Sequence, residues 1–109
     1  MMNTENRDYL LRVREEIEKY YNGFENEDGE EVSLYDYLSD ILDFEITINS
    51  RMEYSSCKVW VALGGPNVWI DTAENEIKIA WGAERDSIWL PSEICEEIDC
   101  YFEELYNCR

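Results

Sequence analysis

The chain has 109 residues, which is enough for one domain and leaves little room for a second. Its 26 Asp and Glu residues outnumber 9 Lys and Arg residues and give a formal net charge of -17. Such a charge repels nucleic acid and anionic lipid, so we expect no direct nucleic-acid partner and no membrane partner, and we expect cationic partners instead. Solubility alone is the alternative explanation of the charge.

The N-terminal part predicts a helix followed by a loop. Apolar residues recur at helical spacing over residues 4–21, and Thr4 can cap this helix. Gly23 is expected to end it. Residues 25–31 then form a polar, acidic loop.

A second, short helix is predicted over residues 33–42. Ser33, followed three residues later by Asp36, resembles a capping box with Asp in place of the usual Glu. The apolar residues of this segment would face inward, whereas Asp36, Asp40 and Asp43 would face solvent.

After these helices the hydrophobic pattern changes to the alternation of strands. Strands are predicted over residues 44–48, 54–63, 68–72 and 77–81, with a further short edge piece over residues 88–90. The links between them are short, and the run Gly64–Asn67 is a strong turn signal. Short links favour an antiparallel sheet of about four strands.

A final helix is predicted from Pro91 or Ser92 to about Tyr106. Its apolar stripe would pack on the sheet, and its opposite side carries carboxylates without a single cation: Glu93, Glu96, Glu97, Asp99, Glu103 and Glu104. The chain is therefore predicted to be one acidic α+β domain over residues 1–109, in the order α-α-β-β-β-β-α, with the helices packed on the sheet.

Catalysis is not expected. The chain has no histidine to act as a base, and its carboxylates lie on predicted solvent faces rather than in buried positions that would shift a pKa. Cys57 lies inside a strand and Cys95 on the apolar stripe, so both are interpreted as structural. Cys100 and Cys108 lie among carboxylates, which disfavour a thiolate. We predict that the protein is not an enzyme.

No metal or cofactor is predicted either. Asn26, Asp28 and Gly29 match the middle of a calcium-binding EF-hand loop. The first and last ligand positions of that loop would be Phe24 and Tyr35, which offer no carboxylate. Neither a secretory signal nor an apolar stretch of roughly 18 residues is present, so four reduced cysteines in the cytoplasm are expected.

Acidic segments that lack cations predict a binding surface that imitates nucleic acid. Residues 20–50 and 86–108 contain acids and no base. Carboxylates four residues apart on a helix rise by about 6 Å, which is comparable to the spacing of consecutive phosphates. A solvated helix face is the alternative. The predicted partner-binding residues are those of the final helix (Glu93, Glu96, Glu97, Asp99, Glu103, Glu104), with Asp36, Asp40, Asp43, Glu27, Asp28 and Glu30.

The four tryptophans, Trp60, Trp69, Trp81 and Trp89, all fall in predicted strands or in the edge piece. Packing in the core is the expected role for most of them. One or two exposed beside the acidic face would anchor a partner well.

The run Gly64–Thr72, the pairs Trp81-Gly82 and Leu90-Pro91, and the acidic helix Ile94–Tyr106 resemble small acidic accessory proteins of Gram-positive mobile genetic elements, both conjugative elements and phages. The resemblance covers roughly residues 57–107 and carries over no catalytic residue. It implies a protein that works in the cytoplasm of a bacterial host.

Such elements encode inhibitors of host defence, including anti-CRISPR and antirestriction proteins, several of which are acidic DNA mimics. The predicted function is non-enzymatic inhibition of a host nucleic-acid-handling defence protein, with a CRISPR effector as the leading candidate. The alternative is a protein-interaction or regulatory module of the element with a different protein partner.

Overall fold

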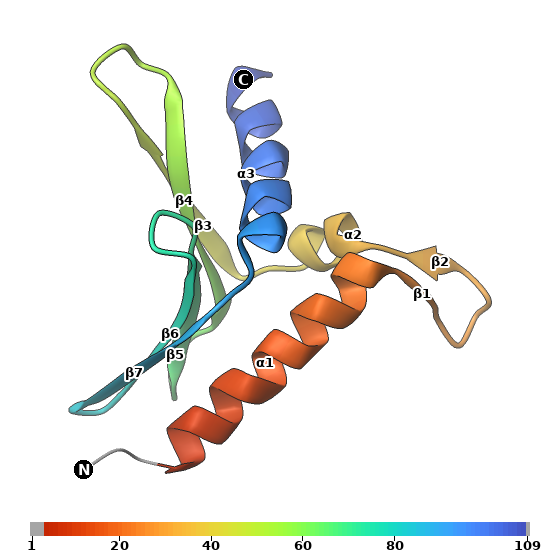
Figure 1. Ribbon diagram of the computed structural model, residues 1–109, viewed down its shortest axis with the longest axis vertical. Helices are drawn as coiled ribbons and strands as arrows, with labels where there is room; N and C mark the ends of the chain where they lie inside the picture. The colour runs from red at the N-terminus through yellow and green to blue at the C-terminus, as the bar shows by residue number, and fades with distance from the viewer. Residues whose placement is uncertain (1–3, 109) are drawn as a thin grey trace.

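The structure is a computed structural model that describes residues 4–108. Figure 1 shows its helices and strands in chain order. They are α1 (Thr4–Asn22), β1 (Phe24–Glu25), β2 (Glu31–Val32), α2 (Leu34–Ser39), β3 (Asp43–Ile48), β4 (Tyr54–Ala62), β5 (Asn67–Asp71), β6 (Glu76–Trp81), β7 (Glu84–Trp89) and α3 (Ser92–Asn107).

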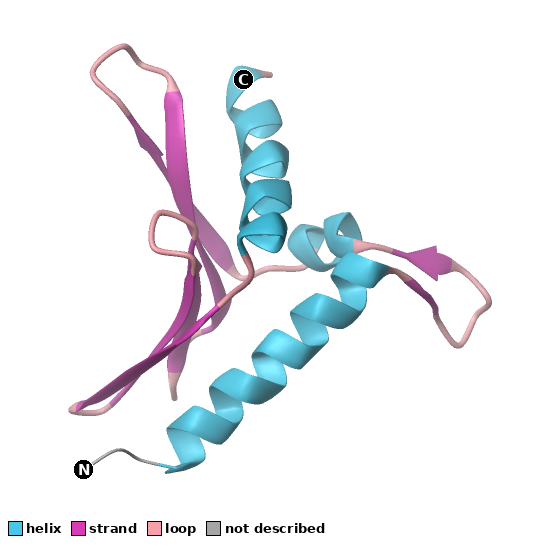
Figure 2. Cartoon of the chain, viewed as in Figure 1, coloured by secondary structure: helices cyan, strands magenta, loops and turns pink. Residues whose placement is uncertain are grey.

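The centre of the fold is a five-stranded antiparallel sheet. Its strands follow the order β3-β4-β5-β6-β7, so each one pairs with its neighbour in the chain. Figure 2 shows the helices together on one side of this sheet, where α1 contacts β6 and β7 and α3 contacts β4. Within residues 4–108, no helix covers the opposite side, which we call the open face.

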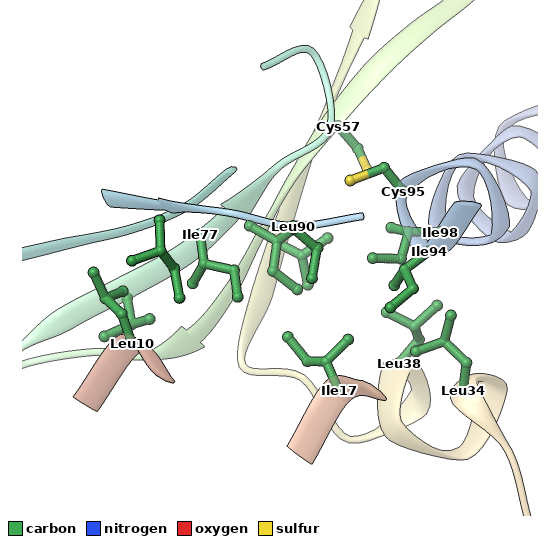
Figure 3. Packing of buried hydrophobic residues seen from close by; sticks show 14 of the residues in the cluster. Leu10, Ile17, Leu34, Leu38, Cys57, Ile77, Leu90, Ile94, Cys95 and Ile98 are labelled. Carbon is green, nitrogen blue, oxygen red and sulfur yellow. The ribbon is translucent and has the colours of Figure 1, made fainter. Parts of the chain in front are cut away.

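The core lies between the sheet and the helices. Alternate strand positions point into it, and the register aligns Val59, Ile70, Ile77 and Ile88 in one buried row across four strands. The helices add further buried side chains to this core, which Figure 3 labels: Leu10, Ile17, Leu34, Leu38, Ile94 and Ile98. Because strand side chains alternate between faces, a slip of one residue would bring the polar open face into the core.

Two contacts fasten the first helix to the last strand. The Arg7 guanidinium donates two hydrogen bonds to the Asp86 carboxylate, from Nε over 3.1 Å and from Nη2 over 2.8 Å. Arg14 donates to the carbonyl of Trp89 over 3.0 Å. A bidentate pair of this kind fixes orientation as well as position, so the angle of α1 on the sheet is set by side-chain geometry.

The α+β class, the antiparallel sheet and the three helices are confirmed, whereas the predicted count of about four strands is too low. The edge piece predicted over residues 88–90 belongs to a complete strand, β7. The first residues of β7 show no alternation of apolar and polar residues in the sequence. Arg85 and Ser87 lie on the open face, and Asp86 faces α1. Both sides of the strand are polar there, so the sequence resembles a loop.

The segment predicted as a loop over residues 25–31 also contains paired strands. Phe24 pairs with Val32 and Glu25 with Glu31, which forms the two-stranded hairpin β1–β2. The side-chain oxygen of Asn26 stabilises its turn by accepting hydrogen bonds from the backbone N–H groups of Asp28 and Glu30. Two residues a strand are too few for any periodic signal.

The predicted helix ends are partly confirmed. Asp36 accepts a hydrogen bond from the backbone N–H of Ser33 over 2.7 Å, as a capping box requires. The helix that follows is shorter than predicted, because it stops at Ser39. The first helix already includes Thr4, so its capping position lies outside the described residues.

Candidate protein-binding surface

The outer face of α3 carries negative charges and no cation. The side of α3 that faces the sheet buries Ile94, Cys95, Ile98 and Phe102. The opposite side exposes every carboxylate that the helical period places there, and within residues 4–108 none of them forms an ion pair: Glu93, Glu96, Glu97, Glu103 and Glu104. We call these five residues the acidic ridge.

One end of α2 lies beside the acidic ridge. The rings of Tyr35 in α2 and Tyr101 in α3 lie 5.6 Å apart between centroids. Desolvation raises the pKa of Tyr35, and the negative charges of Glu97 and Glu104 raise it further. A hollow of about 370 Å³ between the helices includes Tyr21, Tyr35 and Glu97 in its lining. The ridge therefore continues into an exposed aromatic residue.

Asp99 does not belong to this surface, although the sequence suggested that it would. It lies on the flank of α3, where its carboxylate accepts a hydrogen bond of 2.6 Å from the hydroxyl of Tyr54 in β4. Burial and this hydrogen bond both raise the pKa of Tyr54. On the same flank, Tyr106 donates to the carbonyl of Met52 over 2.7 Å. Asp99 thus helps to attach α3 to the β3–β4 hairpin.

The remaining predicted acids are exposed but lie in separate places. Asp36 caps α2, and Asp40 lines a groove of about 320 Å³ beside Glu16 of α1. Asp43 begins β3 and pairs with Trp60, so it lies on the open face. The turn of the β1–β2 hairpin holds the last three and projects away from α3 (Figure 1): Glu27, Asp28 and Glu30. The structure does not join the twelve predicted residues into one surface.

The cysteines are placed as the sequence predicts. Cys57 and Cys95 are buried and lie side by side in Figure 3, whereas Cys100 and Cys108 are exposed, and all four are free. Burial raises the pKa of Cys57 to about 11 and that of Cys95 to about 12, so both are protonated at neutral pH. Within residues 4–108 no three Cys, Asp or Glu side chains gather in a way that could hold a metal ion.

The predicted core role of the tryptophans is wrong. Trp60 and Trp69 are half-buried, Trp81 is 43% exposed and Trp89 is 61% exposed. Trp60, Trp69 and Trp89 point to the open face, because the positions between them hold the buried Val and Ile residues. Strand alternation does not tell a covered face from an uncovered one when large apolar side chains occur on both. The consistent use of Val and Ile at one set of positions was the available signal.

No helix within residues 4–108 has the length and apolar character needed to cross a membrane. The chain matches no family model, and comparisons with curated proteins and with solved structures gave no significant match. The resemblance to mobile-element proteins therefore stays a prediction.

Proposed function

We propose that the protein is a non-enzymatic inhibitor that places the acidic ridge in a basic, nucleic-acid-binding groove of another protein. The observation that carries this proposal is the ridge itself: five exposed carboxylates on one helix with no ion pair among the described residues. The ion pairs of the described chain involve cations of α1 and β6 instead, at Arg7, Arg14 and Lys78. A surface left without counter-charge suits a cationic partner.

The charge density of the ridge supports imitation of a nucleic-acid strand. Glu93 and Glu104 are separated by about 16 Å along the helix, at 1.5 Å for each residue. Five carboxylates over that length are about 4 Å apart on average, which is of the same order as the 3.4 Å per phosphate along the axis of one DNA strand. Because α3 is packed on the sheet, the backbone positions that carry these charges are fixed relative to the rest of the fold.

The partner class comes from the predicted resemblance rather than from the geometry. It is a host defence protein that handles DNA or RNA, with a CRISPR effector as the leading candidate. The protein would then compete with nucleic acid for the groove in the cytoplasm of the bacterial host.

The test reverses Glu96, Glu97, Glu103 and Glu104 together to Lys. The matched control makes the same charge change in the β1–β2 hairpin, by reversing Glu27, Asp28, Glu30 and Glu31, which are also exposed. Binding to a guide-loaded CRISPR nuclease, and its DNA cleavage, are measured over a salt series. Single exposed charge pairs contribute little, so the whole set has to be reversed.

We expect the ridge variant to lose inhibition while the hairpin variant keeps most of it. We also expect wild-type affinity to fall as salt rises, because screening shortens the reach of exposed charges to about 8 Å at physiological ionic strength. An equal loss of inhibition in both variants would mean that inhibition depends on the net charge of the protein and not on the position of the acidic ridge. A complex that survives the ridge reversal and ignores salt would favour the alternative, an interaction module with a different partner.

A further inference from the structure

The open face of the sheet carries a pair of tryptophans in a row of side chains that crosses all five strands. The register places Asp43, Trp60, Trp69, Lys78 and Ser87 side by side. The Trp60 and Trp69 rings are stacked, with centroids 6.2 Å apart and planes at 23°. Both line a broad hollow of about 830 Å³ over this face. Half-exposed tryptophans at the centre of an uncovered sheet have the composition of a protein interface.

The open face carries only a small part of the chain's net charge of -17. Strand alternation places four carboxylates and three cations on it: Asp43, Glu45, Asp71 and Glu76 with Lys58, Lys78 and Arg85. The carboxylate of Glu74, in the turn between β5 and β6, adds a fifth negative charge, because it lies 2.9 Å from the Lys78 ammonium. The charges are interleaved rather than grouped, since Lys58 lies between Glu45 on one neighbouring strand and Asp71 on the other. A partner whose charges are all of one sign would therefore meet attraction and repulsion on this face and would not be bound more tightly by its charge.

Nucleic acid fits this face poorly. Phosphate groups need cations that are not already paired with carboxylates. The nearest cation in the row, Lys78, is already 3.4 Å from the Asp71 carboxylate and 2.9 Å from that of Glu74. The occupant should instead be a protein surface that carries aromatic residues and charges of both signs.

A second copy of the chain offers that surface. Under a two-fold axis the same face meets itself, so interleaved cations of one copy can lie opposite carboxylates of the other. Charge limits the choice of face further, because two copies that met through α3 would bring two acidic ridges together. The open face, in contrast, brings two copies together through interleaved charges of both signs and keeps the acidic ridges apart.

We propose that the protein forms a symmetric dimer in which two open faces pack against each other as a two-sheet sandwich. Trp60 and Trp69 lie at its centre, and packed sheets of this kind stand about 10 Å apart. The acidic ridges stay on the outside, so the dimer does not depend on the proposed inhibitory function.

Sedimentation velocity from micromolar to millimolar concentration tests the dimer. Both copies carry the same net charge, so long-range repulsion opposes association. We expect the dimer to become tighter as salt rises from about 0.1 M to about 1 M, because the screening length falls from about 10 Å to about 3 Å. This is the opposite sign to the salt effect expected for the ridge and its basic partner. A monomer at every concentration and salt level would overturn the proposal.

A matched pair of substitutions locates the interface. Ala80 lies on the open face beside Arg85, whereas Ala83 is exposed in the β6–β7 turn. Ala80→Arg places a bulky side chain beside Arg85 at the interface without removing any packing, and should weaken the dimer by roughly tenfold or more because the two sheets can no longer approach closely. Ala83→Arg changes the net charge equally and should leave the dimer intact. Circular dichroism checks that both variants fold.

A second pair uses the tryptophans. Trp69→Ser removes one ring of the central pair, whereas Trp81→Ser removes an exposed ring that strand alternation places on the helix side. Only the first should weaken the dimer. Dimers of unchanged affinity in Ala80→Arg and Trp69→Ser would exclude the open face. The ridge reversal should leave the dimer in place, so this proposal and the inhibitory function can fail separately.

Discussion

Gly23 ends α1 in a backbone conformation that other residues adopt only at a cost. Its φ of 81° lies in the left-handed region, and its N–H closes the last turn by donating to the carbonyls of Lys19 and Tyr20. A Cβ at this position would meet the nearest atom, the Val32 carbonyl oxygen, at an ordinary 3.6 Å. The requirement for glycine is therefore conformational rather than steric.

We expect Gly23→Ala to lower the free energy of unfolding by about 1 kcal/mol, the usual cost of left-handed backbone for an L-residue. Gly65→Ala is the control, because Gly65 has no positive φ and no atom near its added Cβ. It should be close to neutral. Urea denaturation of the two variants measures the difference, and equal stabilities would contradict the role given to Gly23.

At the scale of the element, α3 is attached by a polar contact as well as by its apolar stripe. The Tyr54 hydroxyl donates to Asp99 over 2.6 Å from a strand 45 residues away in sequence. Hydrogen bonds to a charged acceptor are worth about 1.5–3 kcal/mol when they are sheltered. This one is half-buried, so the lower part of that range applies.

We therefore expect Tyr54→Phe to destabilise the protein by about 1–2 kcal/mol. Glu104→Gln removes a charge from the exposed ridge and should change stability by no more than a few tenths of a kcal/mol. Chemical denaturation with fluorescence detection compares the two. If Tyr54→Phe were neutral, the hydrogen bond would not contribute to the docking of α3.

Elements whose two sides differ in polarity could be predicted, and the others could not. The final helix was predicted closely because its apolar and acidic sides are sharply separated. The start of β7 was missed because polar groups occupy both of its sides, one being held by Arg7 from α1. The tryptophans were misplaced for a different reason, because Trp60 and Trp69 are large apolar residues that lie among polar ones on the open side of β4 and β5. Which side the helices cover is decided by tertiary packing, not by local periodicity.

The candidate site shows the same limit. The acidic ridge follows from helical spacing alone, whereas the removal of Asp99 from it depends on Tyr54, which is distant in sequence. The dispersal of the other predicted acids depends on the β1–β2 hairpin and α2 pointing in different directions from α3 (Figure 1). Composition gave the sign of the charge, and only the fold distributes it.

At the scale of the whole molecule, buried weak acids make stability depend on alkaline pH. Cys57 and Cys95 hold their protons up to pKa values of about 11 and about 12 when folded, against 9.0 for an unperturbed thiol. Between these values the folded state binds more protons than the unfolded state, so stability falls as pH rises. The contribution is complete below about pH 9 and is lost as pH passes through the folded values.

We expect a loss of about 2 kcal/mol between pH 8 and pH 10, with both thiols contributing. The control is the double variant Cys57→Ala with Cys95→Ala, in which the slope of stability against pH should flatten whatever the absolute stability. Urea denaturation at a series of pH values measures both slopes. A slope that stays the same without the two thiols would show that other groups cause it.

The attachment of α1 to β7 has a consequence for how the chain is synthesised. Arg7 and its partner Asp86 are 79 residues apart, and Arg14 and Trp89 are 75 apart. A ribosome adds about 5–20 residues each second, so roughly 4–15 s pass between the appearance of the helix and that of its docking strand. During that interval Leu10 and Ile17, which the finished fold buries, have no β7 to cover them. The nascent helix must remain soluble on its own, and the charged residues on its other side serve that purpose before they serve the folded protein.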